Sequence, residues 1–201
     1  NFRQVMDERK ILLVNLSKGK IGDLNANLLG MIVVGKILMA ALSRVDITDE
    51  KKRLDFNLYI DEFQNFTTDS ISTILSEARK YRLNLTIAHQ FVAQLTEKIR
   101  DAVFGNVGSI IAFRVGAQDA EFLVKQFEPV FNENDLINID NFNALVKILI
   151  NGQTSKPFNM KTLAPENGNE ELVGEIKQFS RLKYGRDRQE VEGEVLKRLR
   201  S

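Results

Sequence analysis

A short apolar run that ends abruptly in two adjacent carboxylates is the feature that most limits the fold of this chain. Leu58, Tyr59 and Ile60 are β-prone and apolar, and Asp61 and Glu62 follow them directly. The pattern predicts a buried strand that delivers two acidic side chains to one end of a sheet. Taken alone, the pattern also fits an ordinary strand end.

Two further apolar runs follow the first along the chain. One predicts a strand over Leu85–Ala88 that ends beside Gln90, and the other predicts a strand over Ile110–Val115. Helix-length segments separate the runs, with helices expected over Ser70–Tyr81, capped by Asp69, and over Gln94–Val103. Strands that alternate with helices indicate a parallel α/β sheet.

The polar residues at these strand ends are therefore expected to lie together. In open parallel sheets, ligands bind beyond the carboxyl ends of the strands. Asp61, Glu62 and Gln90 all occupy that position.

The chain before the acidic pair predicts four segments. Ile11–Leu16 reads as a buried strand and Ser17–Gly22 as a loop. A long helix is expected over Leu24–Ser43, capped by Asp23 or Asn25, and its apolar residues cover most of its circumference, so it should pack on both sides. Residues 46–53 form a charged, exposed connector.

A helix and a hairpin are expected after the third strand. The helix covers Gln118–Phe127, and Pro129 prevents its continuation. The hairpin joins Asn143–Ile150 to Thr154–Met160 through Asn151-Gly152, a pair that favours the positive φ angles of a tight antiparallel turn.

The character of the chain changes at Leu163, which divides it into residues 1–162 and 163–201. A linker with Pro165 and Gly168 leads to amphipathic helices over Glu170–Leu182 and Gln189–Leu199. Two interpretations of these helices stay open. They form a tail docked loosely on the core, which is the simpler interpretation, or they bind a partner.

Composition excludes several classes of protein. The chain has 201 residues, 43% of them hydrophobic, which suits a globular domain. A net charge of +1 gives no global basic field for nucleic acid. The absence of cysteine excludes disulfides and thiolate metal sites and fits a reducing compartment, and a single histidine excludes a histidine-rich metal site. Glycines and a lysine interrupt the apolar run Leu28–Leu42, so we expect no membrane span in this chain.

The order of these motifs resembles the motor domain of the HerA/FtsK superfamily of P-loop ATPases, and most of all the TraG/TraD-type coupling ATPases of type IV secretion and conjugation. The resemblance covers roughly residues 10–160. It is carried by Ile11–Gly22, Leu58–Phe66, Ser76–Gln90 and Phe104–Phe127. It implies a RecA-like, three-layer α/β fold with a parallel sheet, followed by the C-terminal β-hairpin and the helical tail.

The resemblance also implies roles for individual residues. Asp61 and Glu62 match the Walker B element, in which the first carboxylate holds Mg²⁺ through water and the second polarises the attacking water. Gln90 matches the glutamine that senses the γ-phosphate of ATP. Arg79 matches an arginine finger that reaches the nucleotide of a neighbouring subunit, and Arg114 is the competing candidate.

Each of these residues also has a plain structural interpretation. Gln90 could cap the helix that follows it, Arg79 could pair with Glu77 or solvent, and the lone His89 is more typical of a packed residue than of a base. Lys18 and Lys20 lie in a loop between glycines where a chain could contact DNA, although loop lysines are usually solvated.

One departure from the family is important. No G-x-x-x-x-G-K-[ST] phosphate loop occurs in these residues, and Lys18-Gly19-Lys20 lacks both the first glycine and the following Ser/Thr. We therefore expect the C-terminal part of a motor, without the strand that carries the P-loop and inactive by itself.

The resemblance implies the following for the intact protein. It would be a prokaryotic, cytoplasmic, hexameric ATPase, held at the inner face of the membrane by an anchor outside this chain, and it would use ATP and Mg²⁺ to move single- or double-stranded DNA toward secretion-channel proteins. The alternatives are a HerA-like translocase that processes DNA ends and a non-catalytic α/β interaction module.

Overall fold

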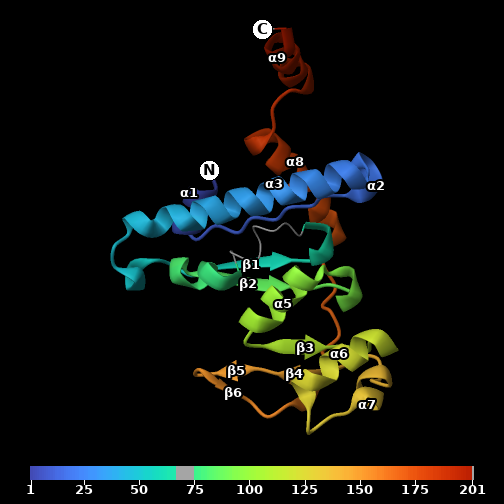
Figure 1. The fold of residues 1–201 in the computed structure, drawn as a ribbon. Helices are drawn as coiled ribbons and strands as arrows, with labels where there is room; N and C mark the ends of the chain where they lie inside the picture. Colours follow the sequence, from blue (N-terminus) through green and yellow to red (C-terminus); the bar gives the residue numbers. More distant parts are fainter. Residues whose placement is uncertain (67–74, 201) are drawn as a thin grey trace. The chain divides into compact units, whose positions relative to one another are not determined.

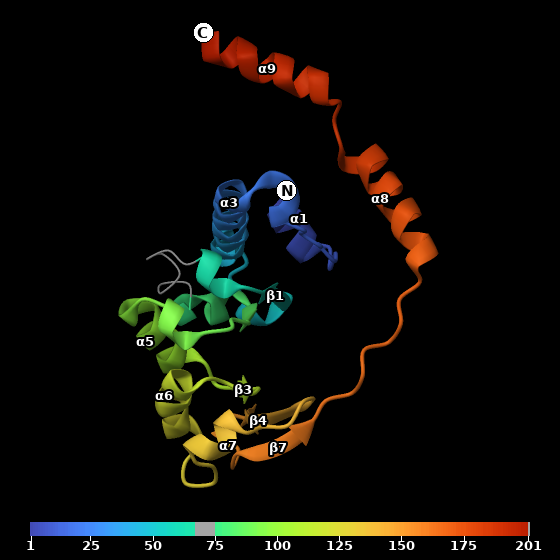
Figure 2. The same ribbon diagram turned by 90° about the vertical axis from the view of Figure 1, so that its right-hand side faces the viewer.

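The computed structural model of this chain describes residues 1–66 and 75–200 and divides into two compact units, Asn1–Thr162 and Leu163–Ser201. Figures 1 and 2 show the element order in two views. Each unit is described by itself below.

A long helix and two parallel strands form the first half of unit 1. Helix α3 (Asp23–Leu42) lies along strands β1 (Phe56–Ile60) and β2 (Leu83–Ile87) (Figure 1). The strands pair in parallel from Phe56 opposite Leu83 to Ile60 opposite Ile87. The two strands predicted around the acidic pair are therefore confirmed, together with their parallel direction.

The two faces of this strand pair differ. Leu83 and Ile60 belong to the core shared with α3, and Leu58 and Leu85 pack against the same core. On the opposite face Tyr59 is 72% exposed, and Asn84 donates a hydrogen bond to Asn57 across the strands. The strand that the sequence predicted to be buried is thus buried on one face only.

The second half of unit 1 contains an antiparallel sheet. Helix α5 (Glu97–Asn106) leads to β3 (Ile110–Ala112), which pairs antiparallel with β4 (Asn143–Lys147), and β4 pairs antiparallel with β7 (Phe158–Lys161). Helices α6 (Ala117–Phe127) and α7 (Glu133–Ile137) lie between β3 and β4 in the sequence.

The third predicted strand therefore exists but does not join the parallel pair. Its partner is the first arm of the C-terminal hairpin, which offers the buried residues Ala144, Leu145 and Val146. The class is mixed α/β, as predicted, but the parallel sheet expected of a RecA-like fold comprises only β1 and β2 among the described residues.

The predicted hairpin and the helix predicted over Gln118–Phe127 are confirmed. Strand β5 (Leu149–Ile150) pairs with β6 (Gln153–Thr154) within the longer hairpin of β4 and β7. Asn151 and Gly152 have φ angles of 50° and 80°, as a tight hairpin turn requires. Helix α6 ends at Phe127, two residues before Pro129.

Two expectations for the N-terminal region are wrong. The segment Ile11–Leu16 is extended but forms no strand, and Ile11 and Leu13 are each 89% exposed, because no described strand lies beside it to complete a ladder. The predicted loop Ser17–Gly22 contains a one-turn helix, α2 (Lys18–Ile21). A short helix, α1 (Phe2–Asp7), begins the chain.

Helix α3 is confirmed, but its surroundings differ from the prediction. Gly22 occupies its N-cap without a side-chain hydrogen bond, so neither Asp23 nor Asn25 caps it. One face buries Ala26, Ile37 and Ala41, whereas the other exposes Leu24, Leu28, Leu29, Ile32 and Met39, so α3 packs on one side in this chain. By length and composition alone, the helical region Asp23–Asp46 is long and apolar enough to cross a membrane. Such a helix is weak evidence for a span, since core helices pass the same test.

The remaining helices deviate in their boundaries. The helix expected from Gln94 begins at Glu97, after a 3-10 turn η5 (Val92–Gln94). The predicted cap at Asp69 and the start of the Ser70 helix lie outside the described residues, and its end is the 3-10 helix η4 (Ala78–Tyr81).

Unit 2 consists of two helices, α8 (Glu170–Tyr184) and α9 (Arg188–Arg200). Both cover the predicted segments, and Gly185 ends α8 as its C-cap.

Candidate functional site

The carboxyl ends of β1 and β2 bring Glu62 and Gln90 into contact. Gln90 Nε2 donates a hydrogen bond of 2.6 Å to Glu62 Oε1. Gln64 Nε2 donates a second bond of 2.6 Å to Glu62 Oε2. Both oxygens of this carboxylate are therefore held by side-chain amides.

Backbone hydrogen bonds from both strands fix the position of this contact between Glu62 and Gln90, which is called the corner below. Ala88 N donates to Ile60 O and Phe63 N donates to Ala88 O, both at 2.9 Å, so the pairing extends one step past the end of β1. Between these bonds Glu62 adopts φ 51°, in the left-handed region, and its N–H donates to Asp61 Oδ1 at 2.9 Å. Asp61 itself is exposed. The sharp turn after β1 places Glu62 beside Gln90, which lies in the segment that follows β2.

A buried aspartate holds the segment that follows Gln90. Asp119, in the first turn of α6, is 5% exposed and accepts hydrogen bonds from Val92 N at 3.0 Å and Ala93 N at 3.2 Å. The sequence analysis missed Asp119 and Gln64. An acidic residue in the first turn of a helix is ordinary, and only the tertiary contact shows that this one anchors the loop beside the site.

Two phenylalanines lie under the corner. Phe63 and Phe66, in the 3-10 helix η3 (Phe63–Phe66), are buried directly after Glu62. Phe66 rests on Gly30 of α3, where an added Cβ would lie 2.1 Å from the ring atom Cε1. This close approach requires glycine, and it couples α3 to the turn that carries the acidic pair.

His89 is a packed residue rather than a member of the site. Burial lowers the pKa of its imidazole, while Asp119 and the backbone of Phe91 act in the opposite direction. Its Nδ1 is buried and has no hydrogen-bond partner in the described part of the chain.

Arg79 lies at the other end of the strand pair. It is exposed and belongs to η4, which leads directly into the amino end of β2, whereas Glu62 and Gln90 lie beyond the carboxyl ends. Five strand residues at about 3.3 Å each separate the two ends by roughly 16 Å. The structure therefore does not bring Arg79 to the acidic pair of its own chain.

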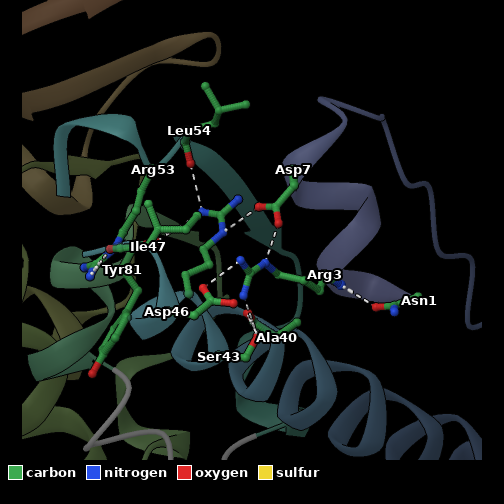
Figure 3. Close-up of polar contacts among 11 residues, drawn as sticks. Asn1, Arg3, Asp7, Ala40, Ser43, Asp46, Ile47, Arg53, Leu54 and Tyr81 are labelled. Carbon is green, nitrogen blue, oxygen red and sulfur yellow. Dashed lines mark hydrogen bonds and ion pairs between the residues drawn. The ribbon is translucent and has the colours of Figure 1, made fainter. Parts of the chain in front are cut away.

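Two buried arginines support the helix that carries Arg79. Arg53 Nη1 donates to Lys80 O at 2.6 Å, and Arg44 Nη1 donates to Tyr81 O at 3.1 Å, so both carbonyls that follow Arg79 are held. Arg44 also donates to Leu54 O and pairs with Asp7 (Figure 3).

This arrangement corrects the expected connector. Arg53 is 8% exposed and Arg44 is fully buried, and 3-10 turns at Ser43–Asp46 and Glu50–Lys52 run through the segment. Residues 46–53 are therefore an anchored segment and not a wholly exposed linker.

The remaining candidate site residues do not contact the corner. Arg114 is exposed just beyond β3 and donates to Asn141 Oδ1 at 3.2 Å. Lys18 and Lys20 are exposed on α2. A hollow of about 360 Å³ is lined by residues of α7, β4 and β7, among them the polar Asn134 and Asp135, and none of the predicted site residues lines it.

The corner suits a magnesium–phosphate group only in part. Among the described residues no cluster of three acidic, histidine or cysteine side chains could enclose a metal. Mg²⁺ bound with substrate phosphates needs only one or two carboxylates, and the exposed Asp61 beside Glu62 meets that need. The backbone cradle for the phosphates is missing, because the phosphate-loop motif does not occur in the sequence.

Comparison with known proteins identifies part of the chain. Residues 55–126 match the family model described as "TraM recognition site of TraD and TraG". This range contains both parallel strands, the acidic pair, Arg79, Gln90 and Asp119. No curated protein matches the chain.

A solved structure supports the fold. VirB4 of Thermoanaerobacter pseudethanolicus superposes with a TM-score of 0.50 at 16% identity, over 74% of this chain and 39% of that chain. At this identity the match concerns the fold alone, and this chain spans well under half of the VirB4 chain. The family match confirms the predicted TraG/TraD resemblance over residues 55–126.

Proposed function

We propose that this chain, which is TraG/TraD-like over residues 55–126, is part of an ATP-driven coupling motor that moves DNA in type IV secretion or conjugation. The phosphate loop of the site would come from outside these residues. The intact protein would be a ring, with each nucleotide between two subunits.

The roles proposed for the residues follow from their chemistry. Asp61, exposed at the strand end, would hold Mg²⁺ through water, and the bound metal would neutralise charge on the phosphates. Glu62 would orient and deprotonate the attacking water. Gln90, as an amide, can donate to a phosphate oxygen and accept from a water.

The contact between Glu62 and Gln90 carries this proposal. A catalytic carboxylate and a phosphate sensor must lie side by side to act on one reaction, and these residues meet across 28 positions of sequence at 2.6 Å. An amide donor contacts each Glu62 oxygen, and each oxygen keeps a second lone pair that can accept a hydrogen bond from a water. A phosphate that attracts the Gln90 amide would free Oε1.

Glu62→Gln in the full-length protein tests this proposal. The substitution keeps the shape of the side chain but removes the base. We expect ATP binding to persist and kcat to fall by about a hundredfold or more, which corresponds to about 3 kcal/mol of barrier. ATP turnover and equilibrium binding of a labelled nucleotide are the measurements.

Glu97→Gln provides the matched control, because it is the same chemical change in the exposed first turn of α5. It should leave kcat unchanged. Unchanged turnover in Glu62→Gln would remove Glu62 from the mechanism.

The family match favours a second candidate function. A region described as a TraM recognition site would bind a partner protein, and residues 55–126 expose the apolar side chains of Tyr59, Phe91, Ile111 and Phe113. Titration calorimetry of the 201-residue chain with a TraM-type protein tests this function. We expect binding that Phe113→Ser weakens and Glu62→Gln does not change, and no binding at all would contradict it.

A further inference from the structure

Helix α8 carries an apolar stripe that the rest of unit 2 leaves exposed. Leu172, Ile176 and Phe179 recur at intervals of four and three residues, and they are 47%, 63% and 64% exposed. Leu182, 79% exposed, continues the stripe at its edge. A helix of fifteen residues is marginal in water by itself and usually depends on packing of its apolar face. A partner surface that packs on the stripe would therefore stabilise α8.

The two ends of the stripe exchange when α8 is reversed about its middle residue. When α8 is reversed about Lys177, Leu172 falls opposite Leu182 and Glu171 falls opposite Lys183. Ile176 then lies beside its own copy near the centre. The helix is therefore complementary to a second, antiparallel copy of itself, as a two-fold interface requires.

The charges along α8 select the same orientation. Its first half carries only acidic charges and its second half only basic ones, and these residues are Glu170, Glu171, Glu175, Lys177, Arg181 and Lys183. Lys183 lies on the stripe itself, four residues after Phe179, and its Nζ lies 5.5 Å from the Phe179 ring centroid. In a parallel pair the two Lys183 ammonium groups would meet, whereas in an antiparallel pair each faces acidic residues.

We propose that α8 is a self-association helix that packs antiparallel against α8 of a second copy of this chain. This contact is separate from the nucleotide corner and does not depend on it. It gives the C-terminal unit a function other than docking on unit 1.

Sedimentation of the 201-residue chain tests the association. We expect a concentration-dependent dimer for the natural sequence and a monomer for Ile176→Asp, because a carboxylate would be buried at the centre of the pair. Gln178→Asp places the same charge two residues further on, on the opposite side of the helix from the stripe, and should still dimerise. A monomer for the natural sequence, or equal loss in both variants, would overturn the proposal.

Disulfide trapping tests the orientation, because the chain has no cysteine of its own. Ile176→Cys should form a dimer by itself, since its copies meet near the two-fold axis. Leu172→Cys should link only when mixed with Leu182→Cys. Self-linking of Leu172→Cys would mean a parallel pair, and no intermolecular link in any mixture would mean that α8 packs within its own chain; either result overturns the proposal.

Discussion

Glu62 has an unfavourable backbone conformation, and both oxygens of its carboxylate accept hydrogen bonds. A residue with a side chain in the left-handed region costs about 1–2 kcal/mol relative to the right-handed one, and Glu62 has φ 51°. The two amide–carboxylate hydrogen bonds, to Gln64 and Gln90, offset that cost. Backbone strain of this kind is concentrated where a side chain must be held for chemistry.

His89 makes stability depend on pH. Burial lowers the pKa of His89 below the value of 6.5 that it has in the unfolded chain. The unfolded chain then binds more protons, so the contribution of His89 is complete above pH 6.5 and is lost as pH falls through that value toward the folded pKa. The free energy of unfolding should fall between pH 7.5 and 5.5, by at most about 1.4 kcal/mol per pH unit.

Urea denaturation at several pH values measures this slope, and His89→Gln is the control. As His89 is the only histidine, its removal should flatten the profile between pH 7.5 and 5.5. An equal slope in both proteins would assign the effect to other groups.

At the scale of residues, the sequence identified site residues that directly follow a strand. It missed residues whose role depends on a contact with an element distant in the sequence. Asp61, Glu62 and Gln90 could be placed because carboxyl ends of parallel strands share an edge. Asp119 acts on Val92 from a different helix, 27 positions away, and no local pattern encodes that contact.

At the scale of elements, local sequence rules predicted which strands and helices form better than they predicted which strands pair. The Asn151-Gly152 turn has a local cause and was predicted correctly, as were α3, α6, β1 and β2. The segment Ile11–Leu16 has the apolar residues of a strand, but a strand also needs a neighbour to receive its hydrogen bonds. Strand β3 found its neighbour in β4, which lies about 30 residues later, and not in β2.

Two glycines of α3 should respond in opposite ways to the same change. At Gly30 a Cβ would clash with the buried Phe66 ring, whereas at Gly35 no atom lies within 4 Å. We expect Gly30→Ala to lower the free energy of unfolding by about 1–3 kcal/mol through overpacking. Gly35→Ala should raise it by about 0.5–1 kcal/mol, because alanine favours the helix.

Urea denaturation of the two variants makes the comparison. Equal and small effects at both positions would contradict the tight packing of α3 on η3.

At the scale of the whole molecule, the position of Arg79 decides how a complete site could be formed. Arg79 and Glu62 lie at opposite ends of the strand pair, so a site that uses both must take them from two subunits. The buried Arg44 and Arg53 hold the carbonyls after Arg79 and thereby fix the helix that presents it.

Subunit mixing in the full-length protein tests this assembly. Arg79→Ala and Glu62→Gln should each abolish turnover while nucleotide binding persists. A mixture of the two should recover partial activity, because some interfaces combine an intact Arg79 with an intact Glu62. ATP turnover against mixing ratio is the measurement, and mixed rings that stay inactive would exclude Arg79 as a residue acting between subunits.

The connections of the two sheets also set an order of folding. The turn at Asn151-Gly152 joins neighbouring strands and closes on a microsecond scale, whereas β1 and β2 can pair only after the 22 residues between them have been arranged. Contacts distant in sequence are entropically costly and form late. We therefore expect the hairpin to gain protection from hydrogen exchange before the amides of Phe63 and Ala88 during refolding. The corner that holds Glu62 and Gln90 would then form after the hairpin, so a chain that is still folding would carry the hairpin but no assembled acidic corner.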